Sequence, residues 1–492
     1  MQRHNPADGD GATLPAASKS DLIETDICVI GAGSGGLSVA AAVAAFGRSV
    51  VLIEKHKMGG DCLNYGCVPS KALIAAAKRA HIMRTSKAFG IGAVSPEVDW
   101  KGVRDHVQGV IANIAPVDSV ERFTGLGVRV LLAPARFIDK KTVQAGEHRI
   151  RARRFVIATG SSPVVPDIPG LDNVGCFTNE TIFSNAEPIG HLIVIGGGPI
   201  GLELAQAYLR LGAKVTVLEA QTALRKEDPE ISAFALNALR EEGVDIRENT
   251  TVERVEGEAG HVRVITRANG HAGVVEGTHI LVAVGRRPSI DGLGLDAARI
   301  KHDETGIRVN PGLVTSNWRV FAIGDCIGGA QLTHLANYHA GIVIRRALFR
   351  LPSTVDNSVI PRVTFTDPEV AHVGLSEEEA RKKNSNICVV RWPYHENDRA
   401  QTERATHGLV KVVTSSKGRI LGASIVGEQA GELIQMWSLA VSQGMKIKAM
   451  TGWVSPYPTL SEINKRVAIR YYAAAASNPM VRKVVSLLAK LG

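Results

Sequence analysis

The sequence is poor in aromatic residues and cysteines, and it contains no long apolar run. Aromatic side chains make up 5% of the chain, and only 6 cysteines occur. That is too few for a disulfide framework, and no Cys or His cluster has the spacing of a metal site, so we expect no bound metal. No apolar stretch reaches the ~18 residues that a membrane-spanning helix needs. The first 20 residues are polar or small and lack the apolar centre of a signal peptide, so we expect a cytoplasmic protein.

The composition otherwise matches a soluble globular chain of several domains. Apolar residues make up 45% and charged residues 21% of the 492 residues. The net charge of +9 raises the question of nucleic-acid binding. However, the Lys and Arg residues are scattered, and few aromatic residues are available to stack on bases. We therefore expect no nucleic-acid partner.

The strongest pattern is an internal repeat. ICVIGAGSGGLSVAAAVAAFGRSVVLIE at Ile27–Glu54 aligns without a gap with LIVIGGGPIGLELAQAYLRLGAKVTVLE at Leu192–Glu219. Each copy has a β-branched run, a G-x-G-x-x-G turn, an alanine-rich or leucine-rich helix, a second apolar run and a final Glu. This order is typical of a βαβ unit that binds a dinucleotide.

Each feature that the two copies share has a physical reason. The first glycine makes a tight turn, the second lets the backbone approach a pyrophosphate, and the third allows close packing of helix and strand. The helix N-terminus then offers unpaired N–H groups to the phosphates, and the final Glu accepts bonds from ribose hydroxyls. These positions are Gly31, Gly33, Gly36 and Glu54 in the first copy, and Gly196, Gly198, Gly201 and Glu219 in the second. We therefore predict two bound dinucleotides.

Two of the cysteines stand close together in a glycine-rich segment. Cys62 and Cys67 lie in GGDCLNYGCVPSK, directly after the first repeat. At the start of a helix, the dipole and the exposed N–H groups lower a thiol's pKa and favour the thiolate. The pair is therefore interpreted as catalytic or redox-sensing. The other cysteines are isolated and are expected to be inert buried thiols; they are Cys28, Cys176, Cys326 and Cys388.

At this point the sequence resembles the flavoprotein disulfide reductases, which include dihydrolipoamide dehydrogenase, glutathione reductase and mercuric reductase. Their GG-x-C-x-x-x-G-C-x-P-S-K signature is met at every fixed position of 59–71. The family's ATG, GRxP and FAIGD turns also occur, at 158–160, 285–288 and 321–325. The resemblance covers the chain except for about the first 20 and the last fifteen residues.

The resemblance implies cofactors and roles. The first repeat would bind FAD with Gly60, Lys71, Thr159, Gly160, Gly324 and Asp325, and the second would bind NAD(H) with Gly285. Cys67 would be the thiol beside the flavin, and Cys62 the thiol that meets the substrate. Lys71 and Glu203 match an ion pair beside flavin N5. Alternatively, Lys71 is a solvated helix residue and Glu203 an ordinary first-turn carboxylate.

The implied fold is α/β, with two Rossmann-like domains and an α+β dimerisation domain. The FAD-binding domain takes residues 21–165 and 284–352, and the NAD(P)-binding domain takes 166–283. The interface domain of a homodimer takes 356–472. In this last part, 389–396 and 408–414 have strand patterns, and 431–444 has the pattern of an amphipathic helix.

The C-terminal motif departs from the family. Dihydrolipoamide dehydrogenase-like members carry H-x-H-P-T-x-S-E, where a His–Glu pair serves the partner's cysteines, whereas this chain has SPYPTLSE at 455–462. Tyr457 replaces the basic His, and a phenol titrates near ~10 rather than ~6.5. Glu462 is either its catalytic partner or half of a Thr459–Glu462 capping box. His334 and His339 are other candidate proton donors, or else packing residues.

Three functions remain open from the sequence. The first is electron transfer to a small thiol or disulfide-type acceptor, with poor lipoamide turnover because the His is absent. The second is an NAD(P)H-dependent quinone or dye reductase, and the third is a redox sensor acting on a partner. Glu219 favours NAD over NADP because a carboxylate repels a 2′-phosphate, although Arg225 and Lys226 follow closely. No cysteine follows Cys388, which disfavours a mercuric reductase with a C-terminal cysteine pair.

The last residues, 477–492, predict a separate amphipathic helix. Ser477 or Asn478 is a candidate N-cap, Pro479 suits the first helical position, and Gly492 suits a stop. An apolar stripe is flanked by Arg482 and Lys483. The stripe either packs on the chain's own interface domain or makes weak contact with an anionic membrane surface.

Overall fold

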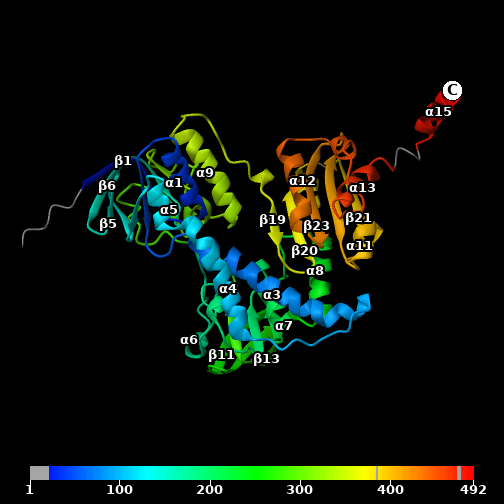
Figure 1. The fold of residues 1–492 in the computed structure, drawn as a ribbon, viewed down its shortest axis with the longest axis horizontal. Helices are drawn as coiled ribbons and strands as arrows, with labels where there is room; N and C mark the ends of the chain where they lie inside the picture. The colour runs from blue at the N-terminus through cyan, green and yellow to red at the C-terminus, as the bar shows by residue number, and fades with distance from the viewer. Residues whose placement is uncertain (1–21, 384–385, 474–477, 492) are drawn as a thin grey trace, which may run out of the picture.

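The computed structural model describes residues 22–383, 386–473 and 478–491. Three regions built on sheets surround two central helices, α3 (Cys67–Thr85) and α4 (Trp100–Ile114) (Figure 1). The α/β class predicted from the sequence is confirmed.

The first sheet contains the first repeat. Its strands run in the order β3-β2-β1-β6-β5-β4, and β18 pairs with β6. The parallel strands are β1 (Leu22–Ile30), β2 (Val50–Glu54), β3 (Arg129–Leu132), β6 (His148–Ile157) and β18 (Val320–Ala322), and β4 (Ala135–Asp139) and β5 (Thr142–Ala145) are antiparallel. Helix α1 (Ser34–Ala45) connects β1 to β2 and packs on α9 (Thr333–Ala347). The predicted βαβ unit is therefore present.

The second sheet contains the second repeat and is also parallel. Its order is β10-β9-β8-β14, with β8 (His191–Ile195), β9 (Lys214–Leu218), β10 (Asp245–Arg247) and β14 (His279–Val282). Helix α7 (Pro199–Arg210) connects β8 to β9, and α8 (Pro229–Glu242) leads to β10. A three-stranded antiparallel sheet follows, formed by β11 (Thr250–Glu258), β12 (His261–Ala268) and β13 (His271–Gly277).

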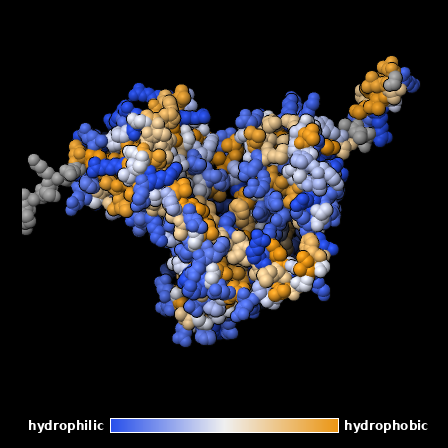
Figure 2. Space-filling view, viewed as in Figure 1, coloured by the Kyte–Doolittle hydropathy of each residue, from blue (hydrophilic) through white to orange (hydrophobic). Residues whose placement is uncertain are grey.

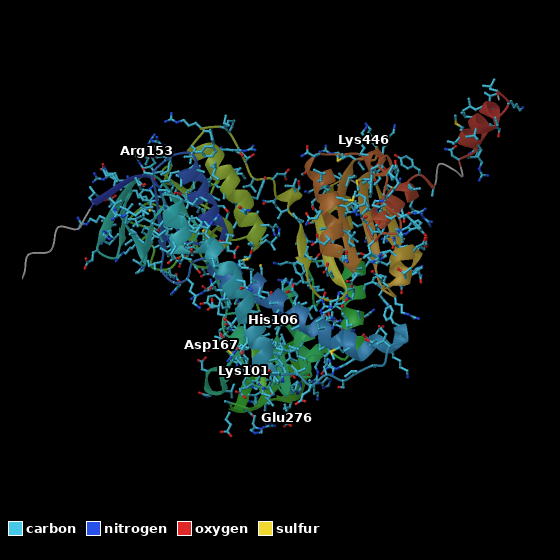
Figure 3. The ribbon with its side chains drawn as sticks, viewed as in Figure 1. Lys101, His106, Arg153, Asp167, Glu276 and Lys446 are labelled. Carbon is cyan, nitrogen blue, oxygen red and sulfur yellow. The ribbon has the colours of Figure 1, made fainter. Side chains whose placement is uncertain are left out.

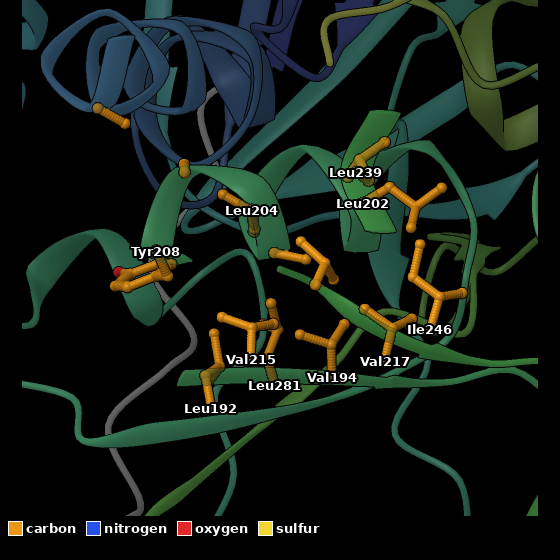
Figure 4. Close-up of a cluster of buried hydrophobic side chains, with 14 of the residues drawn as sticks. Leu192, Val194, Leu202, Leu204, Tyr208, Val215, Val217, Leu239, Ile246 and Leu281 are labelled. Atoms are coloured by element: carbon orange, nitrogen blue, oxygen red, sulfur yellow. The ribbon is translucent and has the colours of Figure 1, made fainter. Parts of the chain in front are cut away.

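One hydrophobic core joins the second sheet to the cysteine helix. Leu192, Val194 and Leu281 of the strands face Leu204 and Tyr208 of α7 (Figure 4). The same cluster includes the buried residues Ala72, Leu73 and Ala77 of α3. Because buried side chains of α3 and of the second sheet belong to one close-packed cluster, the helix and the sheet hold each other in place.

The third sheet is antiparallel, with the order β19-β20-β23-β22-β21. Its strands are β19 (Arg362–Thr364), β20 (Glu369–Gly374), β21 (Ile387–Pro393), β22 (Leu409–Ser415) and β23 (Ile420–Gly427). The predicted helix is present as α12 (Ala430–Ser442), and the strand predicted at 408–414 is β22. The strand predicted at 389–396 was too long, because β21 ends at Pro393 and Tyr394–Glu396 form a 3₁₀ turn. The buried Trp437 of α12 donates its indole N–H to Asn464 of α13 (Glu462–Arg470), at 2.7 Å. This bond satisfies two polar groups inside the core.

Charged side chains of both signs lie on the surface. Arg153 of β6 lies on the first sheet region, and Lys101 of α4 and Glu276 of β13 lie in the lower part of the view (Figure 3). Among the residues that the structure describes, no helix is long and apolar enough to cross a membrane.

The tail helix, α15 (Pro479–Leu488), projects away from the rest of the chain (Figure 1). The side chain of Asn478 caps it by accepting from the Met480 N–H at 2.9 Å, as one of the predicted caps. Ser477 and Gly492 lie outside the described residues. No residue of α15 is buried, so the expectation that its stripe packs on the chain's own interface region was wrong.

Candidate active site

The two glycine turns have the same geometry. Gly31 has a φ of +104° and Gly196 a φ of +112°, which favour glycine. A Cβ on Gly36 would lie 1.9 Å from Gly31 O, and one on Gly201 would lie 2.1 Å from Gly196 O. The third glycine of each motif therefore allows the close contact of helix and turn.

The middle glycines face open space instead. A Cβ on Gly198 would meet nothing within 4 Å, and one on Gly33 would meet only the Gly60 Cα, at 3.9 Å. These positions leave room for a bulky group to approach the backbone, in front of the N-termini of α1 and α7.

This difference gives a matched pair of substitutions. We expect Gly201→Ala to destabilise the protein by about 1–3 kcal/mol, because its methyl group must displace backbone. Gly198→Ala should leave the melting temperature nearly unchanged but raise KM for a nucleotide bound at this turn at least about tenfold, since its methyl group enters the open space before the N-terminus of α7. Thermal denaturation and steady-state kinetics of the two variants check this. Equal effects on stability would contradict the assignment.

The two glutamates that end the repeats are held alike. Glu54 accepts from the N–H groups of Ala32 at 2.7 Å and His56 at 2.8 Å. Glu219 accepts from Gly197 at 2.7 Å and Gln221 at 2.8 Å. A carboxylate has about four acceptor positions, so each retains capacity for the hydroxyls of a ribose.

The residues expected around FAD gather at the same cavity. The hydroxyl of Thr159 is buried and has no hydrogen-bond partner, so it is available to a ligand. Gly160 and Gly324 have left-handed φ values of +68° and +69°. Asp325 accepts from Ser161 Oγ at 2.7 Å, and burial raises the pKa of its carboxyl. These features fit a large polar cofactor.

The cysteine pair lies where two helices meet. Cys62 is in α2 (Gly60–Asn64), and Cys67 is the first residue of α3. Both thiols are free in the structure, and Cys67 is exposed to the cavity. The Cys62 thiol donates to Cys67, Thr333 Oγ1 lies 3.3 Å from Cys67 Sγ, and Lys71 is nearby. Together they lower the pKa of Cys67 to about 6, whereas the same contact and burial raise the pKa of Cys62.

The asymmetry of the two thiols can be measured. In reduced protein, we expect alkylation of Cys67 to increase with pH around a midpoint near about 6, because only the thiolate reacts. Cys62→Ala should move this midpoint upward, since it removes the strongest donor. Thr333→Val should move it by a smaller amount. Mass spectrometry of the labelled peptide at several pH values gives the midpoints, and an unshifted Cys62→Ala value would contradict the geometry.

Lys71 and Glu203 form an ion pair between α3 and α7. Lys71 Nζ lies 2.8 Å from Glu203 Oε2, and the Glu203 side chain is only 7% exposed. The Phe365 N–H donates to Glu203 Oε1 at 2.9 Å, and Lys71 Nζ stands 4.2 Å from the centre of the Phe365 ring. Lys71 is therefore not a solvated helix residue, because its ammonium is fixed one turn from Cys67.

Tyr457 and Glu462 do not join this group within one chain. Neither lines the cavity that holds Cys62 and Cys67. The Tyr457 side chain is 68% exposed and donates to Asp398 Oδ2 at 3.0 Å, which raises the pKa of the phenol. Glu462 lies 2.7 Å from Arg466 Nη2 in α13. Tyr457 and Glu462 therefore bond to different partners and not to each other.

The predicted capping box is absent. Thr459 Oγ1 donates to the Pro456 carbonyl at 2.8 Å, and it accepts no bond from the Glu462 N–H. Glu462 itself begins α13, so the helix starts too late for Thr459 to be its N-cap. The capping interpretation of Glu462 was wrong.

The two candidate histidines have structural partners. His339 is buried and accepts from the Gly324 N–H at 3.2 Å, and burial lowers its pKa to about 4. It is therefore neutral at pH 7 and packs against the predicted flavin turn. His334 lines the cavity, and its Nε2 lies 2.7 Å from the Pro361 carbonyl oxygen.

Sequence reasoning missed several polar contacts around the cysteines. Arg286, only 9% exposed, lies 2.9 Å from Asp61, the residue before Cys62. It also donates to Ser161 Oγ at 2.8 Å. Thr333 was likewise overlooked. The GRxP motif includes Arg286, but it predicts only a turn and not the contact of Arg286 with Asp61.

A single cavity of about 1830 Å³ connects these elements. Both glycine turns, both terminal glutamates, the cysteine pair and the Lys71–Glu203 pair line it, together with the N-terminal end of α12. Gly285 and the Arg225–Lys226 pair line it too, with Arg225 bonded to Gln221 at 2.9 Å. Both glycine turns therefore open towards the same cysteine pair.

Comparison with known proteins agrees with this arrangement. Residues 25–340 match the family described as pyridine nucleotide-disulphide oxidoreductase, and 360–468 match its dimerisation domain. The chain belongs to the pyridine nucleotide-disulphide oxidoreductases. As a member of this family, it is a flavoprotein oxidoreductase that uses FAD and a pyridine nucleotide, and the residues at both turns fit these groups.

Individual relatives differ in the substrates that their names give. The chain is 35% identical to a mercuric reductase of Lysinibacillus sphaericus, over 91% of this chain and 82% of the relative. It is also 35% identical to a dihydrolipoyl dehydrogenase of Geobacillus stearothermophilus, over 91% and 96%. Among solved structures, a Cu(II) complex of the HOCl-induced flavoprotein disulfide reductase RclA from Escherichia coli matches with a TM-score of 0.81. That match has 28% identity and covers 90% of this chain and 99% of the other.

Proposed function

We propose that the protein carries electrons from NADH through FAD to the Cys62–Cys67 pair, and from there to a small acceptor. The observation that carries this proposal is the acidic Cys67 thiol beside the Lys71–Glu203 pair, in one cavity with both glycine turns. FAD, when bound, would supply the chemistry that takes up a hydride from NADH and passes two electrons and a proton to the cysteine pair.

The proposal divides the chain as follows. Residues 21–165 and 284–352 bind FAD, residues 166–283 bind the nicotinamide nucleotide, and residues 356–472 form the interface of a homodimer. The match of 360–468 to a dimerisation domain supports the last assignment. In such a dimer, the exposed Tyr457 face is available to the cavity of the partner subunit.

The thiols then have separate tasks. Two electrons and a proton convert the Cys62–Cys67 disulfide into a Cys67 thiolate and a Cys62 thiol. Lys71 stabilises the thiolate by its charge, and Glu203 holds Lys71 in place. With a disulfide acceptor, the Cys62 sulfur attacks one sulfur and expels the other, which takes up the Cys62 proton and leaves as a thiol. Cys67 then attacks Cys62, which releases the second thiolate and restores the internal disulfide.

This reaction needs protons for the leaving thiolates, and the site supplies them poorly. His339 is neutral and already bonded, and the Tyr457 phenol is held by Asp398. General acid catalysis is typically worth about 10²–10⁴ in rate. Lipoamide-type disulfides should therefore be poor acceptors.

A soft metal ion is a second candidate acceptor, favoured by the same observation. Thiolates bind Hg(II) or copper ions directly, and electron transfer to the ion needs no protonated leaving group. Relatives named mercuric reductase and the Cu(II) complex of RclA support this candidate. Among the described residues, no group of three or more His, Cys, Asp or Glu side chains is placed to hold a metal. The cysteine pair would therefore act as the ligand.

Steady-state NADH oxidation with a panel of disulfides, quinones, Hg(II) and Cu(II) tests the proposal. We expect the wild-type protein to turn over with metal ions or small disulfides. Cys62→Ser should abolish this turnover. Cysteine-independent turnover with quinones alone would instead indicate a quinone reductase. Absence of turnover with all acceptors would indicate a redox sensor.

The nucleotide preference is a separate prediction. We expect kcat/KM for NADH to exceed that for NADPH at least about tenfold, because Glu219 repels a 2′-phosphate. Glu219→Gln, which keeps the shape and removes the charge, should reduce this ratio about tenfold. Glu54→Gln is the matched control in the other turn and should leave the ratio unchanged. A wild-type preference for NADPH would show that Arg225 and Lys226 dominate.

A further inference from the structure

The helix α15 carries an apolar face that none of the residues described by the structure buries. Its apolar residues are 40–75% exposed; they are Met480, Val481, Val484, Val485, Leu487 and Leu488. In the space-filling view, this segment is a separate hydrophobic tip (Figure 2). A helix of this length is only marginally stable alone in water, so its face requires a partner.

The polar side of α15 is basic. At about 100° per residue, these six apolar side chains fall within one arc of about 160°. Arg482, Lys483 and Ser486 fall on the opposite side, Lys490 follows the helix, and 478–491 contains no acidic residue. A narrow apolar stripe would suit one packed helix, but a broad apolar face opposite a basic side without acidic residues is typical of helices that lie on lipid.

The position of α15 also argues against a role in the dimer core. The dimerisation domain matches residues 360–468, and the third sheet and α13 lie within or close to that range. The helix begins after it and projects away from that sheet (Figure 1).

We propose that α15 docks on an anionic lipid surface, with its apolar face among the acyl chains and its cations at the headgroups. Apolar insertion supplies part of the binding. Attraction to anionic headgroups supplies the rest, and it weakens with salt. This inference is independent of the electron acceptor, and it places the flavoprotein at a membrane surface without a spanning helix.

Vesicle flotation of the full-length, FAD-loaded protein tests it, with vesicles of phosphatidylcholine alone or mixed with phosphatidylglycerol. We expect flotation only with the anionic vesicles, and less at high salt. The triple variant Arg482→Gln, Lys483→Gln, Lys490→Gln should lower partitioning at least about tenfold. Val484→Ser with Leu487→Ser should abolish flotation, and the matched polar-face change Ser486→Ala should not affect it.

Three results would overturn the proposal. The first is that the wild-type protein stays unbound to anionic vesicles at low salt. The second is equal flotation with both vesicle types. The third is that Val484→Ser with Leu487→Ser lowers the dimer fraction in light scattering or the melting temperature. In that case a second copy of the chain covers the face.

Discussion

Replacing Tyr457 with histidine is expected to raise disulfide reduction at least about tenfold and to leave quinone reduction nearly unchanged. The imidazole titrates near ~6.5, so it exchanges protons at neutral pH, whereas the phenol does not. Asp398 raises the pKa of the phenol further. Steady-state rates with a small disulfide and a quinone, measured on the same preparation, give the comparison.

Tyr457→Phe is the control for this prediction. It removes the hydroxyl that donates to Asp398 and should change disulfide reduction by less than about twofold, because the phenol is not the proton donor. A large loss in Tyr457→Phe would show that the phenol does serve the reaction. An unchanged rate in Tyr457→His would show that another group handles the proton.

The largest expected loss comes from the cysteines. Cys67→Ser and Cys62→Ser should each lower turnover with disulfides or thiophilic metal ions by about 10³-fold or more, because either change interrupts the relay. The two losses should not add in the double variant, because the thiols act as a unit. Cys176→Ser is the matched control, since that half-buried thiol does not line the cavity. Activity retained in either single variant would contradict the relay.

Local sequence patterns predicted the α/β fold and, within the site, the two glycine turns and the cysteine pair. The two βαβ units were visible because each glycine of the turn has a steric reason that acts over a few residues, as the 1.9 Å approach of a Gly36 Cβ to Gly31 O shows. The helix N-terminus at Cys67 was predictable in the same way. The inert-thiol interpretation fits the buried Cys28 and Cys326, whereas Cys176 and Cys388 are half-buried.

Contacts between distant segments were not predictable from such patterns. Thr333, whose hydroxyl contacts the Cys67 thiol, is 266 positions from Cys67 in the sequence. Asp398 is 59 positions from Tyr457. The capping box failed because a four-residue pattern does not determine where α13 begins; a proline-rich segment before it directs the Thr459 hydroxyl to Pro456 instead. The tail helix was predicted as a helix, but the exposure of its apolar face depends on tertiary structure.

The central claim, that Cys67 is the thiolate beside the flavin, is tested most directly by anaerobic titration of the FAD-loaded protein with NADH. A thiolate in contact with FAD gives a broad absorbance beyond the long-wavelength edge of the flavin spectrum. We predict that this band forms in the wild-type protein, persists in Cys62→Ser and is lost in Cys67→Ser. A band that persists in Cys67→Ser but is lost in Cys62→Ser would contradict the account by reversing the two thiols.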